Sequence, residues 1–477
     1  MDTVTWAAES LDSSLILTLP KSGYSLLPEK RTFLLLVGVL LASALAPLGS
    51  TSIAVAMPQI AKFMEMDPGT ATQLLVGGYL LISVIGQAPA GKLGDIIGYQ
   101  KALYMGLAMF MFGSLLAYLV RSIEVLLISR MMMAAASAMI VPNASAMLRT
   151  QLPESMLPFA YGIFGATMGA AAAVGPLLGG TLTQFFDWPA IFLMNVPWAM
   201  LALGLIVMTS KPLVEERKGR LDLRSTVLLA FAIGALQLGF IGEDVDLRLV
   251  VSGVLLLSLF VWVQLRIDEP IFDPRFFKRP AYAAAACTTA FGNFTMYALL
   301  FQLPIFFVDV RQVAEIEIAG ALTAMTLCMM IGGPMSAVAG RLIGIRYTAV
   351  LAACANIFGL YLYSDLESAL APADIIVPMA LMGFAGGIAG PVVQAAGMLA
   401  IEKEKAGMAA GGLSTMRYLG GALGISILSL NLGTESMTSV EQHLSIIPYY
   451  AGALTIVLMS AFLLPASNKK ADHMEGS

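Results

Sequence analysis

Long apolar stretches recur along almost the whole chain, and short polar segments separate them. A helix needs about 20 mostly apolar residues to cross the hydrocarbon core of a bilayer. The breaks carry charges or turn residues, as at Asp67-Pro68-Gly69 and Pro153-Glu154-Ser155. The pattern predicts an all-α polytopic membrane protein with fourteen transmembrane helices. The predicted spans are 33–55, 71–90, 102–120, 125–148, 159–183, 190–209, 226–242, 247–265, 281–308, 317–339, 346–363, 374–398, 407–431 and 446–465.

Composition agrees with a membrane protein and argues against other classes. The 477 residues are 58% hydrophobic and only 12% charged, whereas soluble domains carry about 25% charged residues. The cysteines Cys287, Cys328 and Cys354 fall in apolar spans, without the spacing of a disulfide framework or a metal site. The sequence also has no recognisable nucleophile–base pair and no phosphate-binding loop. We therefore expect a monomer that is not an enzyme and that binds no cofactor, metal or nucleic acid.

The basic residues predict how the chain lies in the membrane. Of the 27 Lys and Arg residues, 21 fall in segments that the helix alternation places on the side of the N-terminus, and 4 fall on the opposite side. The remaining two, Arg130 and Arg417, lie within spans. Short loops rich in Lys and Arg stay cytoplasmic. We expect a multi-pass protein of a bacterial inner membrane with both termini in the cytoplasm.

A short internal echo predicts two similar halves. The loop after the second span begins Gly91-Lys92-Leu93, and the loop after the tenth begins Gly340-Arg341-Leu342. Two six-helix halves joined by two extra central helices would explain this spacing. The expected division is a cytoplasmic tail over 1–32, an N-terminal half over 33–210, loops and linker helices over 211–280, a C-terminal half over 281–466 and a cytoplasmic tail over 467–477.

Small residues form a stripe along the fifth span. Residues 175–180 read Gly-Pro-Leu-Leu-Gly-Gly, and spacing of three to four residues places small side chains on one helix face. Such a face lets a neighbouring helix approach closely, and a proline removes a backbone donor. The stripe is either a flexible interface between moving helices or an ordinary packing face. Its members are Gly165, Gly169, Ala173, Pro176 and Gly180, with Gly175 and Gly179 beside them.

Several motifs together identify a family resemblance. They are the loop from Gly91 to Gly98, Arg130 in the fourth span, the stripe ending at Gly180, the segment from Trp188 to Pro197, and Arg417-Tyr418-Leu419-Gly420-Gly421 in the thirteenth span. In this order and spacing the chain resembles the fourteen-helix drug:proton antiporter branch of the major facilitator superfamily. The resemblance covers the first thirteen spans, most strongly residues 51–197. It implies the major facilitator fold and a carrier that exchanges its cargo for protons.

The chain departs from that family at the position of a helix 1 acid. Many members carry an aspartate before a threonine in the first span, and here Gly49 stands there, two residues before Thr51. No Asp, Glu or His lies near the middle of any predicted span. A proton-coupled carrier needs a group that changes its protonation as it faces each side. Proton coupling is therefore implied by the resemblance and unsupported by the residues.

Arg130 and Arg417 are the two charges embedded in predicted spans. A charged residue inside a membrane is a functional hypothesis by default. Arginine does not release its proton in proteins, so it cannot carry the coupled proton itself. It can bind an anionic group, hold backbone carbonyls or adjust a neighbouring acid, whereas its structural role would be to anchor helix ends. We expect both arginines at the coupling or substrate site.

The resemblance implies that the loop acid Asp95 joins the two halves on the cytoplasmic side. A carboxylate can accept hydrogen bonds from the free N–H groups at a helix N-terminus and is favoured by the helix dipole. We expect its partner at the start of the thirteenth span, near Gly407. Gly91 and Gly98 would allow the tight turn around it. The alternative is a solvated loop charge.

Polar side chains inside the spans are candidates for the lining of a binding cavity. Ligand sites in such carriers lie near the midplane of the membrane, between the repeats. For each residue, hydrogen bonding between helices is an equally good explanation. The candidates are Tyr79, Gln87, Asn143, Asn293, Tyr297, Gln302 and Gln394.

These observations predict a secondary active transporter in a lipid bilayer that exports small amphipathic or drug-like molecules by alternating access. The resemblance implies proton antiport. One alternative keeps the fold and carries an endogenous metabolite, lipid or organic anion without proton coupling, as two embedded cations without an acid would suit. A second alternative is a membrane receptor on a carrier fold that transports nothing.

Overall fold

The computed structural model describes seven parts of the chain, residues 26–65, 73–210, 221–239, 246–311, 315–365, 371–432 and 439–465. All regular structure in these parts is helical. The predicted tails lie largely outside the described residues, as do the breaks at 67–69 and 243–245 and most of the loop after the sixth predicted span.

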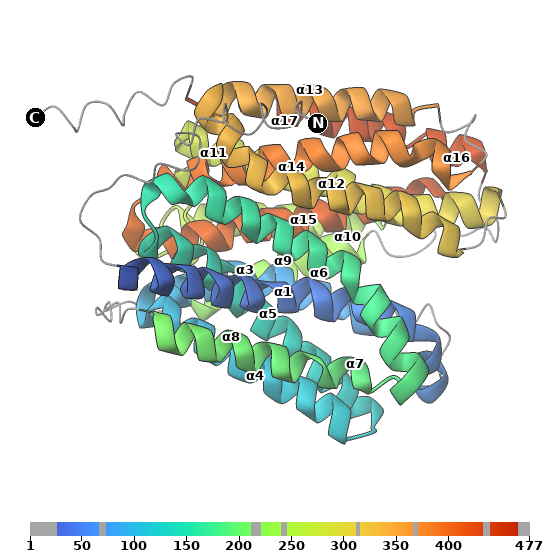
Figure 1. The fold of residues 1–477 in the computed structure, drawn as a ribbon, viewed down its shortest axis with the longest axis horizontal. Coiled ribbons are helices and arrows are strands. Elements are labelled where there is room, and N and C mark those ends of the chain that lie inside the picture. Colours follow the sequence, from blue (N-terminus) through green and yellow to red (C-terminus); the bar gives the residue numbers. More distant parts are fainter. Residues whose placement is uncertain are drawn as a thin grey trace, which may run out of the picture.

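The helices form two groups with a linker pair between them in sequence (Figure 1). The N-terminal group holds α1 (Leu26–Phe63), α3 (Gly78–Ile97), α4 (Tyr99–Leu119), α5 (Ile123–Gln151), α6 (Leu157–Phe186), α7 (Ala190–Leu193) and α8 (Asn195–Thr209). The linker pair is α9 (Leu223–Leu238) and α10 (Leu247–Gln264). The C-terminal group holds α11 (Pro280–Ile305), α12 (Glu315–Leu342), α13 (Ile345–Tyr363), α14 (Ile376–Leu399), α15 (Ala406–Leu432), α16 (Val440–Leu444) and α17 (Ile447–Ala461).

Each predicted span coincides with a helix in its described part, and several helices are longer than predicted. The first begins at Leu26 and ends at Phe63, beyond both ends of the predicted 33–55. Ten helices of the described chain are long and apolar enough to cross a membrane. The total of fourteen crossings stays a prediction.

Helix termini follow from local sequence. The hydroxyl of Ser122 accepts a hydrogen bond from the N–H of Val125 and caps α5, and the carboxylate of Asp246 accepts from Arg248 and Leu249 and caps α10. An oxygen acceptor at this position satisfies donors that have no partner inside the helix.

The two similar loop motifs each contain a glycine with a positive φ angle. Gly98 joins α3 to α4 with φ of 91°, and Gly344 joins α12 to α13 with φ of 85°. Side chains strongly disfavour this region, so glycine is the residue that permits both turns. We call the end of the bundle that carries Gly98 and Gly344 the motif end, at the left of Figure 1, and the opposite end the far end.

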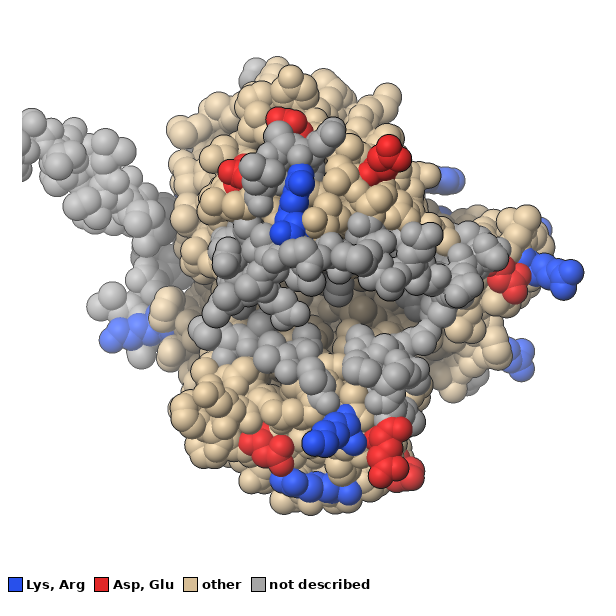
Figure 2. Space-filling model, turned by 90° about the vertical axis from the view of Figure 1, so that its right-hand side faces the viewer, with Lys and Arg blue, Asp and Glu red and all other residues tan. Residues whose placement is uncertain are grey.

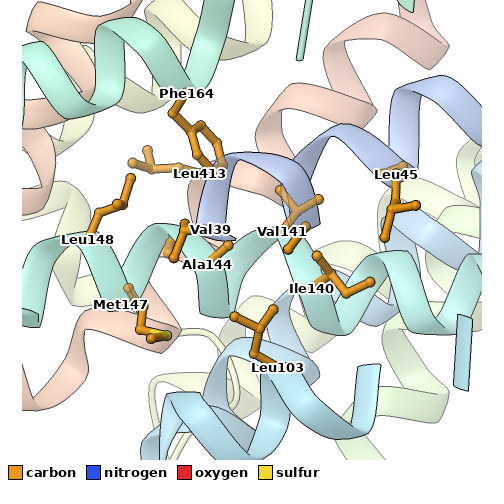
Figure 3. Packing of buried hydrophobic residues seen from close by; sticks show 14 of the residues in the cluster. Val39, Leu45, Leu103, Ile140, Val141, Ala144, Met147, Leu148, Phe164 and Leu413 are labelled. Carbon is orange, nitrogen blue, oxygen red and sulfur yellow. The ribbon is translucent and has the colours of Figure 1, made fainter. Parts of the chain in front are cut away.

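Helices pack closely both within each group and across the boundary between the groups. In the N-terminal group α1 packs on α6 and α8, and α5 packs on α3 and α4. In the C-terminal group α14 packs on α12 and α13, and α11 packs on α15 and α17. Between the groups, α3 and α5 meet α15, and α6 meets α12 and α14. The largest apolar cluster extends across this boundary, with Leu413 of α15 among side chains of the N-terminal group (Figure 3).

Candidate functional site

The carboxylate of Asp95 joins the two groups at the motif end. Its Oδ1 accepts a hydrogen bond from the N–H of Gly407 at 2.8 Å, and its Oδ2 accepts from the N–H of Met408 at 2.9 Å. These donors lie in the first turn of α15, where N–H groups lack partners within the helix. The hydroxyl of Tyr99 lies 2.8 Å from Asp95 Oδ1 and 3.2 Å from the carbonyl oxygen of Lys403. The contact expected near Gly407 is therefore present.

Glycines bring α3 and α15 into backbone contact beside this carboxylate. A Cβ atom at Gly91 would overlap the carbonyl oxygen of Gly407, and one at Gly407 would overlap that of Gly91. One further turn along, a Cβ at Gly411 would lie 2.7 Å from the carbonyl oxygen of Gln87. Any larger residue would separate the helices, so this contact depends on the bare Cα atoms.

Two further arginines close the same end: Arg341 of the second loop motif, and Arg149, which no motif contains. Arg149, in the last turn of α5, is buried and donates from Nε to the carbonyl oxygen of Met398 at 3.3 Å. Arg341, at the end of α12, donates from Nη2 to the carbonyl oxygen of Ser155 at 3.2 Å. Each bond joins one group to the other. The sequence signal is a basic residue at a helix C-terminus, where the free carbonyls of another helix can receive it.

Arg130 is buried inside the N-terminal group, and backbone groups surround its guanidinium. Nη1 donates to the carbonyl oxygen of Gly49 at 3.1 Å, and Nε and Nη2 both donate to that of Leu75 at 3.3 Å. The guanidinium carbon lies 4.4 Å from the centre of the Tyr79 ring, in a cation–π arrangement. The carbonyl of Gly49 thus meets Arg130 at the position where many family members carry an acid.

Three of the expected cavity residues lie instead between helices of the N-terminal group or at its contact with α15. The hydroxyls of Tyr79 and Ser137 are 2.5 Å apart. Asn143 donates from its amide to the carbonyl oxygen of Ala90 at 3.0 Å and so joins α5 to α3. Gln87 is fully buried at the contact with α15, and neither atom of its amide has a hydrogen-bond partner.

A cavity of about 250 Å³ lies between the two groups. We call it the central cavity. Helices α6, α11, α12 and α14 supply most of its lining, and Pro47 of α1, Asn356 of α13, Arg417 of α15 and two residues of α17 complete it. Of the residues that the sequence singles out, Gly165, Gly169, Asn293, Tyr297, Gln394 and Arg417 line it. Figure 2 looks onto the far end and shows a hollow between the two groups.

Arg417 is the charged residue of this lining. Its Nη2 donates to Oε1 of Gln394 at 3.1 Å, and its Nη1 lies 3.7 Å from the thioether sulfur of Met168, a weak acceptor. No Asp, Glu or His is among the described residues that line the cavity. The rest of the lining is apolar or neutral and includes five methionines, which adapt to ligands of different shape. The central cavity is therefore an apolar chamber with one cation in its wall.

Gln302 does not line the central cavity. It is buried, and its amide nitrogen donates to the carbonyl oxygen of His443 at 2.9 Å. Its Oε1 accepts from the hydroxyl of Tyr363 at 3.0 Å and from that of Tyr450 at 2.9 Å. The prediction placed it near the cavity because it follows Asn293 and Tyr297 on the same helix. The amide instead joins α11 to α13, α16 and α17.

The small residues of α6 allow close packing against two neighbouring helices, α1 and α12. A Cβ at Gly175 would overlap the hydroxyl of Thr51, and one at Gly179 would overlap the carbonyl oxygen of Ser52, both in α1. Nearer the motif end, a Cβ at Gly162 would overlap the backbone of Gly333 in α12. Pro176 and Gly180 lie within the same continuous helix. The stripe therefore allows close packing both inside the N-terminal group and against the C-terminal group.

The described residues contain no group of three His, Cys, Asp or Glu side chains that could hold a metal ion.

Known proteins with similar sequences are membrane transporters. The uncharacterized MFS-type transporter YvkA of Bacillus subtilis is 28% identical over 423 residues, which cover 88% of this chain and 95% of that protein. The tetracenomycin C resistance and export protein of Streptomyces glaucescens is 27% identical, over 87% of this chain and 78% of that protein. The methyl viologen resistance protein SmvA of Salmonella typhimurium is 28% identical, over 86% and 84%.

Solved structures share the fold. The human organic anion transporter MFSD10 (TETRAN) matches with a TM-score of 0.62 and 15% identity, over 92% of this chain and 100% of that one. FucP in its outward conformation also matches with a TM-score of 0.62, at 12% identity, over 90% and 98%. The sequence profile described as Major Facilitator Superfamily matches residues 39–425. The chain belongs to the major facilitator superfamily of membrane transporters, as its motifs predict.

Proposed function

We propose that this transporter exports small amphipathic molecules by alternating access, and that Arg417 binds an anionic or electron-rich group of the cargo. The observation that carries the proposal is the central cavity with Arg417 in its wall. An arginine has five N–H donors, and the acceptors around Arg417 are one amide oxygen and one thioether sulfur. Apolar walls suit the remainder of an amphipathic molecule.

The motif end is proposed to face the cytoplasm of a bacterial cell, with both termini on that side of the inner membrane. The 21-to-4 distribution of Lys and Arg supports this orientation. The bacterial relatives support the bacterial membrane. Labelling of single cysteines in the two tails of intact cells tests it, because labelling from outside would reverse the assignment.

In this orientation the structure corresponds to an outward-facing state. The bonds of Asp95, Arg149 and Arg341 hold the two groups together at the motif end. Opening towards the cytoplasm requires these bonds to break while contacts form at the far end. At Gly91, Gly407 and Gly411 the contact between α3 and α15 is one of backbone on backbone, so the two helices can separate there once the bonds of Asp95 and Tyr99 break. The proposed motion is a rocking of the two groups about the central cavity.

The relatives support cargo of a drug-like kind. Two of them are named for resistance to, or export of, tetracenomycin C and methyl viologen. These names describe those proteins, and at about 27% identity they suggest a cargo class for this chain without identifying the compound. The methionine-rich lining agrees with a cargo of variable shape.

A second candidate is a carrier of organic anions that is not coupled to protons. Two observations favour it over the antiport that the family resemblance implies. The described lining of the central cavity has no acid, and a backbone carbonyl at Gly49 takes the place of the helix 1 acid beside Arg130. A backbone carbonyl cannot release and rebind a proton during the transport cycle, and the described lining of the cavity supplies no acid that could.

Transport by the purified protein in liposomes separates these candidates. The anionic amphiphile anilinonaphthalene sulfonate and the dication methyl viologen serve as probes, with and without an imposed pH gradient. The proposal predicts uptake of the anion that Arg417→Ala abolishes. Stimulation by the gradient would support antiport, and equal rates would support the uncoupled carrier. Transport of methyl viologen alone would contradict the role of Arg417, and transport of neither probe would favour the receptor alternative.

A further inference from the structure

A second cavity lies on the side of the bundle, beneath the linker pair. Its volume is about 330 Å³. We call it the linker cavity. It is bounded by α9 and α10, by the short 3-10 helix η4 (Pro274–Lys278), and by the contact between α3 and α15. Its lining is apolar apart from Thr415 and includes Leu229, Leu257, Phe277, Met416 and Leu419.

The lining of the linker cavity is too apolar to hold ordered water. Thr415 contributes the one polar side chain, and its buried hydroxyl has no hydrogen-bond partner. An ordered water needs two to four polar partners, and apolar cavities without them stay dry and bind apolar molecules. An engineered apolar cavity of about 150 Å³ is large enough for benzene. The linker cavity has about twice that room, so its fitting occupant is a longer hydrocarbon.

The position of the cavity identifies the source of that hydrocarbon. The outer faces of α9 and α10 carry large exposed apolar side chains, such as Phe231 at 66% exposure and Leu255 at 64%. Apolar side chains exposed on membrane-spanning helices face lipid. Phe277 is itself partly exposed at the edge of the cavity, so the chamber adjoins this lipid-facing surface. The bilayer is thus the hydrocarbon reservoir next to it.

Helix α15 is covered by α11, α3 and α5, and by α9 on the side of the linker cavity. None of the described side chains between Ala406 and Leu432 is exposed. Thr415, Met416 and Leu419 line the linker cavity, whereas Arg417, one residue along, lines the central cavity. A hydrocarbon chain that reaches this stretch of α15 from the linker side must occupy the linker cavity.

We propose that the linker cavity binds one acyl chain of a bilayer phospholipid, inserted beneath α9 and α10 against residues 415–419 of α15. The occupant packs on the opposite side of α15 from the cargo site. Its presence supports the segment that positions Arg417. This proposal is independent of the cargo and of proton coupling.

Photolabelling tests the site directly. The full-length protein is reconstituted with a phospholipid that carries a diazirine in the middle of one acyl chain, and labelled peptides are mapped by mass spectrometry. The expected result is labelling at residues 415–419. Leu229→Trp fills the cavity and should reduce that labelling at least fivefold. Val227→Trp is the matched control, because Val227 lies on the same helix and is 53% exposed; it should label like the wild type.

The outcomes decide the occupant. No labelling at residues 415–419, or labelling that Leu229→Trp leaves unchanged, overturns the proposal. Labelling there by a photoreactive single-chain alcohol but not by the phospholipid would also overturn it and assign the cavity to a small amphiphile. If Leu229→Trp does not fold, Leu257→Phe provides a smaller filling of the same cavity and should reduce labelling at least twofold.

Lipid retention gives a second measurement. Native mass spectrometry should detect one more phospholipid on the wild type than on Leu229→Trp after the same detergent wash. Thr415→Val replaces the unpartnered hydroxyl with a methyl group and should retain that lipid at least as long as the wild type. Faster loss of the lipid from Thr415→Val would show that the hydroxyl binds a polar ligand, and would overturn the assignment.

Discussion

Arg130 and Arg417 are both arginines buried in membrane-spanning helices, and their surroundings differ. Three N–H groups of Arg130 donate to backbone carbonyls, and the Tyr79 ring covers one face. Arg417 has one amide oxygen and one sulfur, and it lines a cavity. A buried cation is stable only where donors are matched by acceptors. The fold supplies backbone acceptors for the N–H groups of Arg130. In the proposed function, the cargo supplies further acceptors for the N–H groups of Arg417.

The structure separates the two arginines that the sequence places at the coupling or substrate site. Arg130 is not among the residues that line the central cavity. Its bonds to the carbonyls of Gly49 and Leu75 link α5 to α1 and to the π-helix η2 (Gln73–Gly77). We therefore propose an architectural role for Arg130 and a cargo-binding role for Arg417, and a coupling role of Arg130 stays a prediction.

The largest effect is expected for Arg130→Leu. It removes the Arg130 donors from the carbonyls of Gly49 and Leu75, and each hydrogen bond from a charged group contributes roughly 1.5–3 kcal/mol. We expect the free energy of unfolding to fall by about 2–5 kcal/mol, measured as loss of monodisperse protein on heating in detergent. The control is Arg121→Leu, whose exposed ion pair with Asp187 contributes about 1 kcal/mol or less. If the Arg130→Leu protein is as stable as the wild type but inactive, the result would support a role for Arg130 in coupling and contradict the architectural role.

Arg417→Ala should affect binding and leave the fold intact. A hydrogen bond to a charged group contributes about 1.5–3 kcal/mol, which corresponds to a roughly 10- to 100-fold increase in the apparent Kd for an anionic cargo. A neutral analogue of similar shape should lose less than about threefold. Arg417→Lys should recover only part of the loss, because an ammonium lacks the planar pair of parallel N–H donors with which a guanidinium binds both oxygens of a carboxylate. Equal losses for anionic and neutral cargo, measured by tryptophan fluorescence titration, would indicate a structural role.

Gln394→Leu should give a smaller loss of the same kind. The amide oxygen of Gln394 orients Nη2 of Arg417, and a neutral hydrogen bond contributes about 0.5–1.5 kcal/mol. We expect the apparent Kd for the anion to rise by roughly 2- to 10-fold. Gln394→Glu provides the informative counterpart, because its carboxylate would pair with Arg417 and compete with the anionic cargo. Tighter anion binding by Gln394→Glu would contradict the assignment.

The smallest effect is expected for Asp95→Asn. An amide has one acceptor oxygen, so it keeps only one of the two bonds from the N–H groups of Gly407 and Met408, and the charge lost at the helix N-terminus contributes about 0.3–1 kcal/mol. A cysteine at Asn293, in the central cavity, should become more accessible from the motif end. A cysteine at Ser137, beside Tyr79, should stay unlabelled from either side, because the surroundings of Arg130 do not open. Lys92→Gln changes a charge in the same segment and serves as the control.

Sequence alone predicts features that depend on a local signal. The helix pattern could be predicted from the apolar stretches, because each helix needs one segment and one general rule. The pairing of Asp95 with the first turn of α15 joins residues 312 positions apart, and it was expected because the family resemblance implies it. A helix N-terminus binds anions, which explains the contact physically but does not select this partner.

Contacts between distant segments could not be predicted in the same way. Arg149 bonds a carbonyl 249 positions away, and Gln302 bonds hydroxyls 61 and 148 positions away. Tyr79 and Gln87 are eight residues apart, and this spacing does not show which neighbouring helix each side chain meets. Tyr79 meets α5 and Gln87 meets α15, so the spacing did not mean a shared cavity.

The amide of Gln302 has a consequence for how this chain is made. Helices enter the membrane in order from the ribosome, and α11 arrives before α13, α16 and α17 supply its partners. During that interval a polar amide sits in hydrocarbon with its acceptor and donors unmatched, which disfavours leaving the insertion machinery. We therefore expect the C-terminal group to pack stably only when the last helix supplies the hydroxyl of Tyr450. A nascent chain arrested before Tyr450 should remain bound to the translocon and be degraded there.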